Sequence, residues 1–231
     1  MKRFKVFIKL IAITILLGII LIFAIGYGNY VKVSNKISVE EKVGIIQQTQ
    51  SYTRIENISP YLIQATISIE DHRFYEHHGI DFVSLLRAFI NNLFSKGIVG
   101  GGSTITQQLA KNMFYSYNAS YIRKISEMFS AIDLEKKLDK NEILELYVNI
   151  INYGDNHMGI YEASMGYFDK VPSDLTLAEA SLLAGIPQSP ANFQLSNHLE
   201  DAKIRQKAVL EAMVRDGWIT QSEMETVLRE S

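Results

Sequence analysis

Two adjacent carboxylates, Glu70 and Asp71, follow an apolar stretch with helical spacing and open the segment IEDHRFYEHHG. Because the preceding residues are apolar, at least one of the two carboxylates is expected to be partly buried. Burial raises the proton affinity of a carboxylate. Such a group can act as a general base, an effect worth roughly 10²–10⁴-fold in rate. Glu70 is therefore the first candidate for a catalytic residue.

The same segment carries three histidines, His72, His77 and His78. A structural metal site is one interpretation of them. Their spacing is not H-E-x-x-H, however, and no distal pattern of further ligands accompanies them. Hydrogen bonding near a helix end is the role that we predict for these side chains.

The second candidate site is the stretch GGSTITQQLAKN. Thr104 and Gln107 fit a capping box, which predicts that a helix begins within the stretch. A helix start that follows glycines offers free backbone N–H groups and a partial positive charge. Gln107, Gln108 and Lys111 share a face of the same helix. This combination would suit a phosphate or a pyrophosphate.

Other interpretations of these segments differ in strength. A nucleotide P-loop is excluded, because Ser103 stands where that motif needs a lysine and no buried strand precedes it. A helix start without any ligand, with Lys111 in solvent, stays open. In RKISE, Arg123 and Glu127 are also spaced like an ordinary surface ion pair.

These residues must be positioned by a mainly α fold, because the pattern is helical almost throughout and no βαβ alternation occurs. Helix starts are predicted at Ser59-Pro60, Asp81, Ser120, Thr176 and Thr220. We expect the first of these helices to stop near Gly79. Helical patterns also cover 140–149 and 201–216. One domain is predicted over residues 51–231.

The N-terminus carries Lys2, Arg3, Lys5 and Lys9, and residues 10–27 contain no charge. We predict a cytoplasmic basic tail over 1–9, a transmembrane anchor over 10–27 and a stalk over 28–50, which is irregular with a short strand or two. The charge bias predicts a cytoplasmic N-terminus and an extracytoplasmic domain. A cleaved signal peptide is the alternative, but the apolar run is longer than a usual signal core.

The composition excludes one class of function. The chain has 231 residues, a net charge of −2 and no cysteine. No overall basic field points to nucleic acid, and no disulfide supports the fold.

Four segments in order match a known family pattern. The patterns are E-D-x-x-F-x-x-H-x-G, G-G-S-T-I-T-Q-Q, R-K-x-x-E and K-x-E-I-L-E-x-Y-x-N, and they are met at residues 70–79, 101–108, 123–127 and 140–149. The stretch LTLAEASLLAGIPQSP looks like the last motif of the same family. Together they resemble the peptidoglycan glycosyltransferases, the transglycosylase module of class A penicillin-binding proteins and its monofunctional relatives.

The resemblance implies a lysozyme-like, two-lobed domain with a small membrane-facing lobe, the jaw, at about 82–100. The implied reaction is inverting transfer of a polyprenyl-pyrophosphate-linked glycan to the 4-hydroxyl of lipid II. Glu70 would be the general base, and Glu127 would assist at the donor or hold Mg²⁺ or Mn²⁺. The implied substrate-binding residues are Lys111, Gln107, Gln108, Ser103, Thr104, Arg87, Arg123, Lys124, Asp71, Phe74, His77 and Asn149.

The resemblance also implies where the protein works. Its partners would be lipid II, lipid-linked glycan, the membrane and other proteins of cell-wall synthesis, at the outer face of a bacterial cell membrane. The jaw would meet the membrane through Phe89, Ile90, Leu93, Phe94, Ile98 and Val99, with Lys96 at the headgroups. No S-x-x-K nucleophile with a K-T-G partner occurs, so we expect a monofunctional enzyme.

Two positions depart from the family pattern. Ala119 stands where most relatives have an arginine that grips the pyrophosphate, and Ser126 stands where a lysine is common. Losing two cations would slow departure of the pyrophosphate unless other groups compensate. A weakly active or inactive lipid II-binding scaffold is therefore the alternative function, and a glycan-cleaving hydrolase is a third.

Overall fold

The computed structural model describes residues 2–94, 102–116 and 120–230, and within these ranges the chain is mainly helical. The nearest approach to a strand there is an isolated bridge between Asn152 and Met158. The mainly α prediction is thus confirmed. The α-helices are α1 Lys2–Ser34, α2 Val39–Gln47, α3 Pro60–Glu70, α4 Phe82–Phe94, α5 Ile105–Phe114, α6 Tyr121–Lys137, α7 Lys140–Ile150, α8 Ile160–Phe168, α9 Leu177–Gly185, α10 Pro190–Phe193, α11 Leu199–Arg215 and α12 Gln221–Glu230.

Most helix starts follow from local sequence. Thr104 and Asp139 form complete capping boxes at the starts of α5 and α7, and Thr176 does so at α9. Ser120 accepts a hydrogen bond from the backbone N–H of Arg123 at the start of α6. A side-chain oxygen that satisfies a free N–H favours helix initiation at that residue. The starts predicted at Thr104, Ser120 and Thr176 are confirmed, and the capping box of Asp139 was not predicted.

The first helix of the domain ends earlier than we predicted. α3 stops at Glu70, and Asp71 already has a non-helical backbone. Gly79 instead lies in the following loop with φ of +86°, where an added Cβ would come 2.9 Å from the carbonyl oxygen of Ala131. Glycine fits this position because it alone tolerates both the dihedral angle and the close approach.

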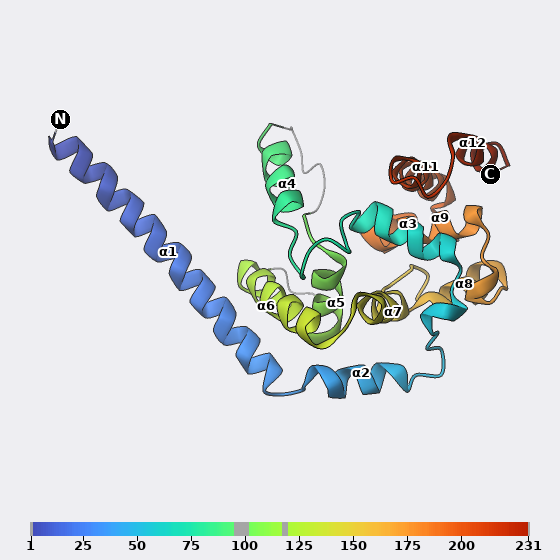
Figure 1. Ribbon diagram of the computed structural model, residues 1–231, viewed down its shortest axis with the longest axis horizontal. Coiled ribbons are helices and arrows are strands. Elements are labelled where there is room, and N and C mark those ends of the chain that lie inside the picture. Colours follow the sequence, from blue (N-terminus) through green and yellow to red (C-terminus); the bar gives the residue numbers. More distant parts are fainter. Residues whose placement is uncertain (1, 95–101, 117–119, 231) are drawn as a thin grey trace.

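Helix α1 is long and apolar enough to cross a membrane, judged by length and composition. It projects away from the helical body (Figure 1). Over the predicted anchor nearly all of its side chains are exposed, which is the pattern of a helix that needs an apolar solvent.

The C-terminal part of α1 packs along α6. Ser126 of α6 is fully buried, and its hydroxyl donates to the carbonyl oxygen of Gly26 at 2.9 Å. Asn29 Nδ2 donates to the same hydroxyl oxygen at 3.0 Å. The ring of Phe129 stacks edge-to-face on Tyr27, with centroids 5.1 Å apart. Ser126 therefore faces α1.

The predicted irregular stalk with short strands is wrong. α1 continues through Tyr27 to Ser34 without a break, and α2 follows after a short turn. Ser38 caps α2 by accepting from the N–H of Glu41. The apolar face of α2 joins the domain core through Val39 and Ile46.

The core lies around α7, whose inward face is fully buried. α5 packs between α6 and α7, and α3 packs against α9 and α11 (Figure 1). The largest fully buried side chains include Leu62, Ile105, Leu109, Leu144, Tyr147 and Leu183. This packing brings the end of α3, one face of α5 and the first turns of α6 together.

Helix α4 projects from the body, on the side toward which the N-terminal end of α1 runs (Figure 1). Its exposed side chains are mostly apolar, and Phe82, Val83, Leu86 and Ile90 line a shallow groove on its surface. Of the predicted jaw residues, Lys96, Ile98 and Val99 lie outside the described residues, and for Phe89, Leu93 and Phe94 only the backbone is described.

Candidate active site

The carboxylate of Glu70 lies at the last residue of α3, where that helix meets α5 and α7. Its side chain is 11% exposed. Gln108 Nε2 donates to Glu70 Oε2 at 2.5 Å, and the hydroxyl of the fully buried Tyr147 donates to Gln108 Oε1 at 3.3 Å. The amide of Gln108 is thus oriented with its NH₂ toward the carboxylate.

Burial raises the pKa of the Glu70 carboxyl above its ordinary value of 4.5, and the nearby charge of Asp71 adds to the increase. The hydrogen bond from Gln108 and the positive charges of Arg205 and Lys111 lower it in part. A carboxylate in such a setting keeps a hydrogen-bonded ionised form and gains affinity for a proton. Both properties are what a general base needs.

Asp71 joins the first motif to the second. Its carboxylate lies 2.9 Å and 3.0 Å from Nε2 of the buried His77, and it accepts from the backbone N–H of Ile105 at 3.0 Å. Thr104 donates through its hydroxyl to the carbonyl oxygen of Gly79 at 2.7 Å. These contacts fix the start of α5 beside the end of α3.

The start of α5 does not offer the free N–H groups that we expected for an anion. The N–H of Ile105 is bound by Asp71, and that of Gln107 is bound by the hydroxyl of Thr104. Gln107 accepts in turn from the N–H of Thr104. Protein groups therefore already satisfy two of the N–H donors that were expected to bind an anion, and the anion site at the helix start stays a prediction. The cationic surface lies further along α5, at Lys111.

A cavity of about 460 Å³, here called the cationic cavity, opens beside Glu70. Its lining comes from α3, α5, α6, the turn after α9 and α11. The lining residues are Ile69, Glu70, Ser103, Gln107, Gln108, Lys111, Arg123, Lys124, Glu127, Pro187, Gln188 and Arg205. Four of these are cations and two are carboxylates, so the cavity is set up for an anion.

Glu127 orients two of the four cations. Its buried carboxylate lies 2.8 Å from Arg123 Nε and 3.2 Å from Lys124 Nζ. Lys124 also donates to Ser103 Oγ at 2.6 Å. Burial lowers the pKa of the Lys111 ammonium, while Glu127 and Glu70 raise it. The cations are thus held by acidic partners at the cavity wall.

The predicted metal role of Glu127 does not fit its surroundings. Mg²⁺ and Mn²⁺ prefer several oxygen ligands. Within the described residues no group of three or more His, Cys, Asp or Glu side chains could hold an ion. Both oxygens of Glu127 face cations.

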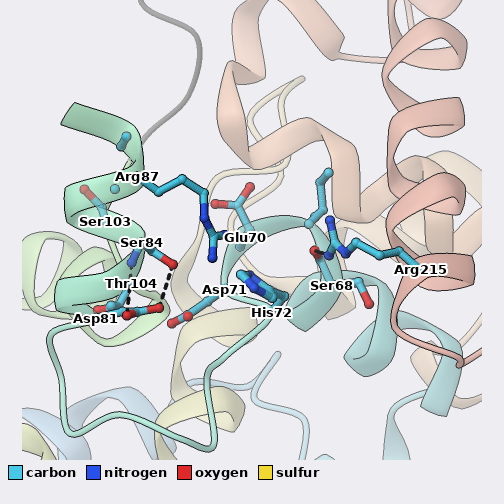
Figure 2. Close-up of a pocket in the computed structure, with 13 residues that line it drawn as sticks. Ser68, Glu70, Asp71, His72, Asp81, Ser84, Arg87, Ser103, Thr104 and Arg215 are labelled. Carbon is cyan, nitrogen blue, oxygen red and sulfur yellow. Dashed lines mark hydrogen bonds between the residues drawn. The ribbon is translucent and has the colours of Figure 1, made fainter. Parts of the chain in front are cut away.

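A second cavity of about 200 Å³, here called the α4 cavity, lies on the other side of Glu70. Figure 2 shows Arg87 of α4 extending toward Glu70, and Arg215 of α11 on the opposite side. Arg215 is held by a hydrogen bond to the carbonyl oxygen of Ser68 at 3.0 Å. Glu70 and Ser103 line both cavities. The Glu70 carboxylate therefore lies between the two cavities.

Three predicted binding residues lie outside both cavities. Phe74 is fully buried, and His77 is buried against Asp71. Asn149 binds the backbone of Thr53, accepting from its N–H at 2.7 Å and donating to its carbonyl at 2.8 Å. These residues support the site from within the fold and do not contact a ligand space. Ala119 lies outside the described residues.

Sequence reasoning missed two cations of the site. Arg205 lines the cationic cavity and Arg215 lines the α4 cavity, both from α11. Each lies on a helix with an ordinary amphipathic pattern, so no local signal in the sequence marks it. Only the packing of α11 on α3 and α9 brings them to Glu70.

The protein is a helical domain attached to an apolar N-terminal helix. Two cavities meet at the Glu70 carboxylate, and the cations that line them can bind anionic ligands. The family model Transglycosylase matches residues 38–214. The chain therefore belongs to the transglycosylase family, as the four motifs indicated.

Curated relatives support the same family. The chain is 41% identical over 184 residues to penicillin-binding protein 1A of Neisseria flavescens, which covers 80% of this chain and 23% of that protein. It is 42% identical over 177 residues to penicillin-binding protein 1A of Escherichia coli, covering 77% of this chain and 21% of the relative.

Penicillin-binding protein 1F of Bacillus subtilis is 36% identical over 241 residues, covering 97% of this chain and 34% of the relative. A crystal structure of penicillin-binding protein 1A from Haemophilus influenzae aligns with a TM-score of 0.47 and 20% identity, over 78% of this chain and 17% of that one. The chain thus spans about a sixth to a third of the length of these proteins.

Proposed function

We propose that this protein polymerises lipid II into glycan strands. In the proposed reaction, Glu70 takes the proton from the 4-hydroxyl of lipid II, and the oxygen attacks the anomeric carbon of the growing strand. The polyprenyl pyrophosphate leaves from the opposite face, so the configuration inverts. The observation that carries this proposal is that Glu70 lines both the cationic cavity and the α4 cavity.

The cationic cavity supports the proposed donor site. A departing pyrophosphate carries several negative charges, and Lys111, Arg123 and Lys124 line the cavity beside Glu70. Preorganised cations stabilise charge that develops on a leaving group. Glu127 keeps Arg123 and Lys124 at the cavity wall, which gives the second glutamate a role that needs no metal.

The α4 cavity supports the proposed acceptor site. It is the smaller of the two spaces around Glu70, and Arg87 extends into it from α4 (Figure 2). An arginine there can bind a phosphate of the incoming lipid II through its planar guanidinium. The acceptor hydroxyl would then lie next to the carboxylate of Glu70.

The membrane attachment is part of the same proposal. α1 would cross the bilayer with its basic N-terminus in the cytoplasm, and the domain would lie outside. The exposed apolar side chains of α4 would enter the lipid interface, where a lipid-linked substrate arrives. In this proposal α4 is the described part of the predicted jaw. The partner proteins of wall synthesis and the monofunctional character of the enzyme stay predictions.

Polymerisation of purified lipid II tests the proposal. The full chain in detergent or vesicles should produce glycan polymer, and Glu70→Gln should reduce the rate by at least roughly 10²-fold, the usual contribution of a general base. A wild-type protein that binds lipid II and yields no polymer would favour the scaffold alternative. Release of fragments from finished wall material would favour the hydrolase alternative.

A further inference from the structure

Arg205 is a mostly buried cation that no motif assigned. It lies on α11, and its side chain is 17% exposed. The guanidinium Nη2 lies 4.0 Å from Glu70 Oε1, and the residue lines the cationic cavity together with Lys111. The base and the cationic cavity therefore share one guanidinium.

The guanidinium of Arg205 has unused donors. Its Nε is buried without a hydrogen-bond partner among the described residues. Arg215, on the same helix, differs, because it donates to Ser68 and to Asp216. A guanidinium carries five N–H donors in a planar fork that matches phosphate oxygens. Buried donors without protein partners are what a ligand-binding arginine shows in the absence of its ligand.

The fold makes room for this side chain at one position. A Cβ added at Gly185, the last residue of α9, would lie 2.8 Å from Arg205 Cγ. The backbone of Gly185 is an ordinary right-handed one, so the dihedral angles do not call for glycine. The close passage of the Arg205 stem over α9 does.

The other cations of the cavity are more committed. Arg123 and Lys124 both pair with Glu127 at 3.2 Å or less. The position before Glu127, where family members often carry a lysine, is Ser126, which faces α1. Lys111 and Arg205 are therefore the cavity cations whose charge is least neutralised by close carboxylates in the described chain.

We propose that Arg205 binds the pyrophosphate of the lipid-linked donor and, through the same guanidinium, positions the carboxylate of Glu70 next to it. This inference rests on the proposed function of the site. Arg205, on α11, would supply the positive charge that most relatives carry as an arginine at the position of Ala119 in this chain. The ligand class is a pyrophosphate ester, and the leaving group and the base are coupled through one side chain.

Binding of a short-chain polyprenyl pyrophosphate to the full chain in detergent tests the first half. Arg205→Gln should weaken binding by about tenfold, the loss of a charge-assisted contact, and Arg205→Lys by less. Gly185→Ala should weaken binding in the same direction, because the added methyl displaces the arginine stem. Lys207→Gln, on the exposed side of α11, is the matched control and should bind as wild type does.

The rate of lipid II polymerisation as a function of pH tests the second half. Without the neighbouring guanidinium, the ionised form of Glu70 is less favoured relative to the protonated form. The acidic limb of the pH–rate profile should therefore move to higher pH in Arg205→Gln. Asp71, Lys111 and Gln108 also face Glu70 and are unchanged in this variant. A merely structural arginine would lower the melting temperature and leave the acidic limb in place.

Two results separate this inference from the proposed function. An active wild type whose Arg205→Gln variant keeps both the affinity for pyrophosphate and the pH profile would overturn the role of Arg205. An inactive wild type would overturn the proposed function, and the binding comparison would still decide whether Arg205 contacts a pyrophosphate.

Discussion

The hydroxyl of Ser126 on α6 donates a hydrogen bond to the carbonyl oxygen of Gly26 on α1, 2.9 Å away. Ser126 comes directly before Glu127, so the apolar helix α1 is hydrogen-bonded to α6 one residue away from a carboxylate of the candidate site. The serine that departs from the family pattern thus has a structural explanation, because it belongs to a helix crossing. Small residues allow such close crossings, also within membranes.

The crossing predicts a difference between two glycines of α1. A Cβ at Gly26 would come 2.5 Å from Ile125, whereas a Cβ at Gly28 would meet nothing within 4 Å. We expect Gly26→Val to lower the free energy of unfolding by about 1–3 kcal/mol, the usual cost of overpacking. Gly28→Val is the control with the same side chain. Equal unfolding curves for both variants in detergent would contradict the packing of α1 on α6.

The raised pKa of Glu70 predicts a gain of stability when its charge is removed. The folded state binds the proton more tightly than the unfolded chain, so stability falls as pH rises through the Glu70 titration. Glu70→Gln should therefore have a larger free energy of unfolding than wild type at neutral pH. The expected gain is about 1.4 kcal/mol for each tenfold difference in proton affinity between the folded and the unfolded chain. The gain should shrink near pH 4, and a constant difference across pH would argue against a buried carboxylate with a raised pKa.

Gln108 should control the protonation state of Glu70, because its amide donates to the Glu70 carboxylate. In Gln108→Glu a donor to the carboxylate is replaced by a second carboxyl, which favours the protonated base. We expect the kcat of lipid II polymerisation to fall by roughly 10²-fold, with a smaller effect on KM. The fall should be partly reversed at higher pH if protonation is the cause. A change in KM alone would show that Gln108 serves substrate binding instead.

The bonds of Asp71 predict a stability effect that is separate from chemistry. Asp71→Asn removes the charge that binds both His77 and the N–H of Ile105. The free energy of unfolding should fall by about 1.5–3 kcal/mol, the range for hydrogen bonds to charged groups. His78→Ala, at an exposed neighbouring histidine, is the control and should unfold as wild type does in chemical denaturation.

The exposed apolar side chains of α4 should matter only where a bilayer is present. Phe82→Ser with Leu86→Gln removes exposed apolar surface and leaves Arg87 in place. We expect slower polymerisation of lipid II in vesicles and an unchanged rate with a short-chain lipid II in solution, because burial of apolar surface drives interfacial binding. An equal loss in both assays would mean that these side chains support the domain itself.

The local parts of this structure could be predicted from the sequence. Thr104, Ser120 and Thr176 mark helix starts because a cap depends on residues only a few positions apart. Glu70 and Lys111 were recognised from motifs and do lie on one cavity. Contacts between distant helices could not be predicted in this way.

Arg205 and the end of α1 illustrate that limit. Arg205 reaches Glu70 only because α11 packs on α3. Residues 28–34 look polar enough for a stalk, yet they stay helical because α6 supports them through Ser126 and Phe129. The start of α5 is another example, because Asp71 from the preceding motif accepts a hydrogen bond from the N–H of Ile105, a contact that the local pattern does not show.

Helix α1 runs without a break from its apolar half to its crossing with α6, so the described chain has no hinge between the candidate membrane span and the helix that carries Glu127. In the proposed membrane attachment, the two cavities would therefore stay at a constant height above the lipid surface. In the proposed polymerisation, lateral diffusion of the lipid carriers would deliver successive sugar units. The growing glycan strand would then move past a site that stays fixed relative to the membrane.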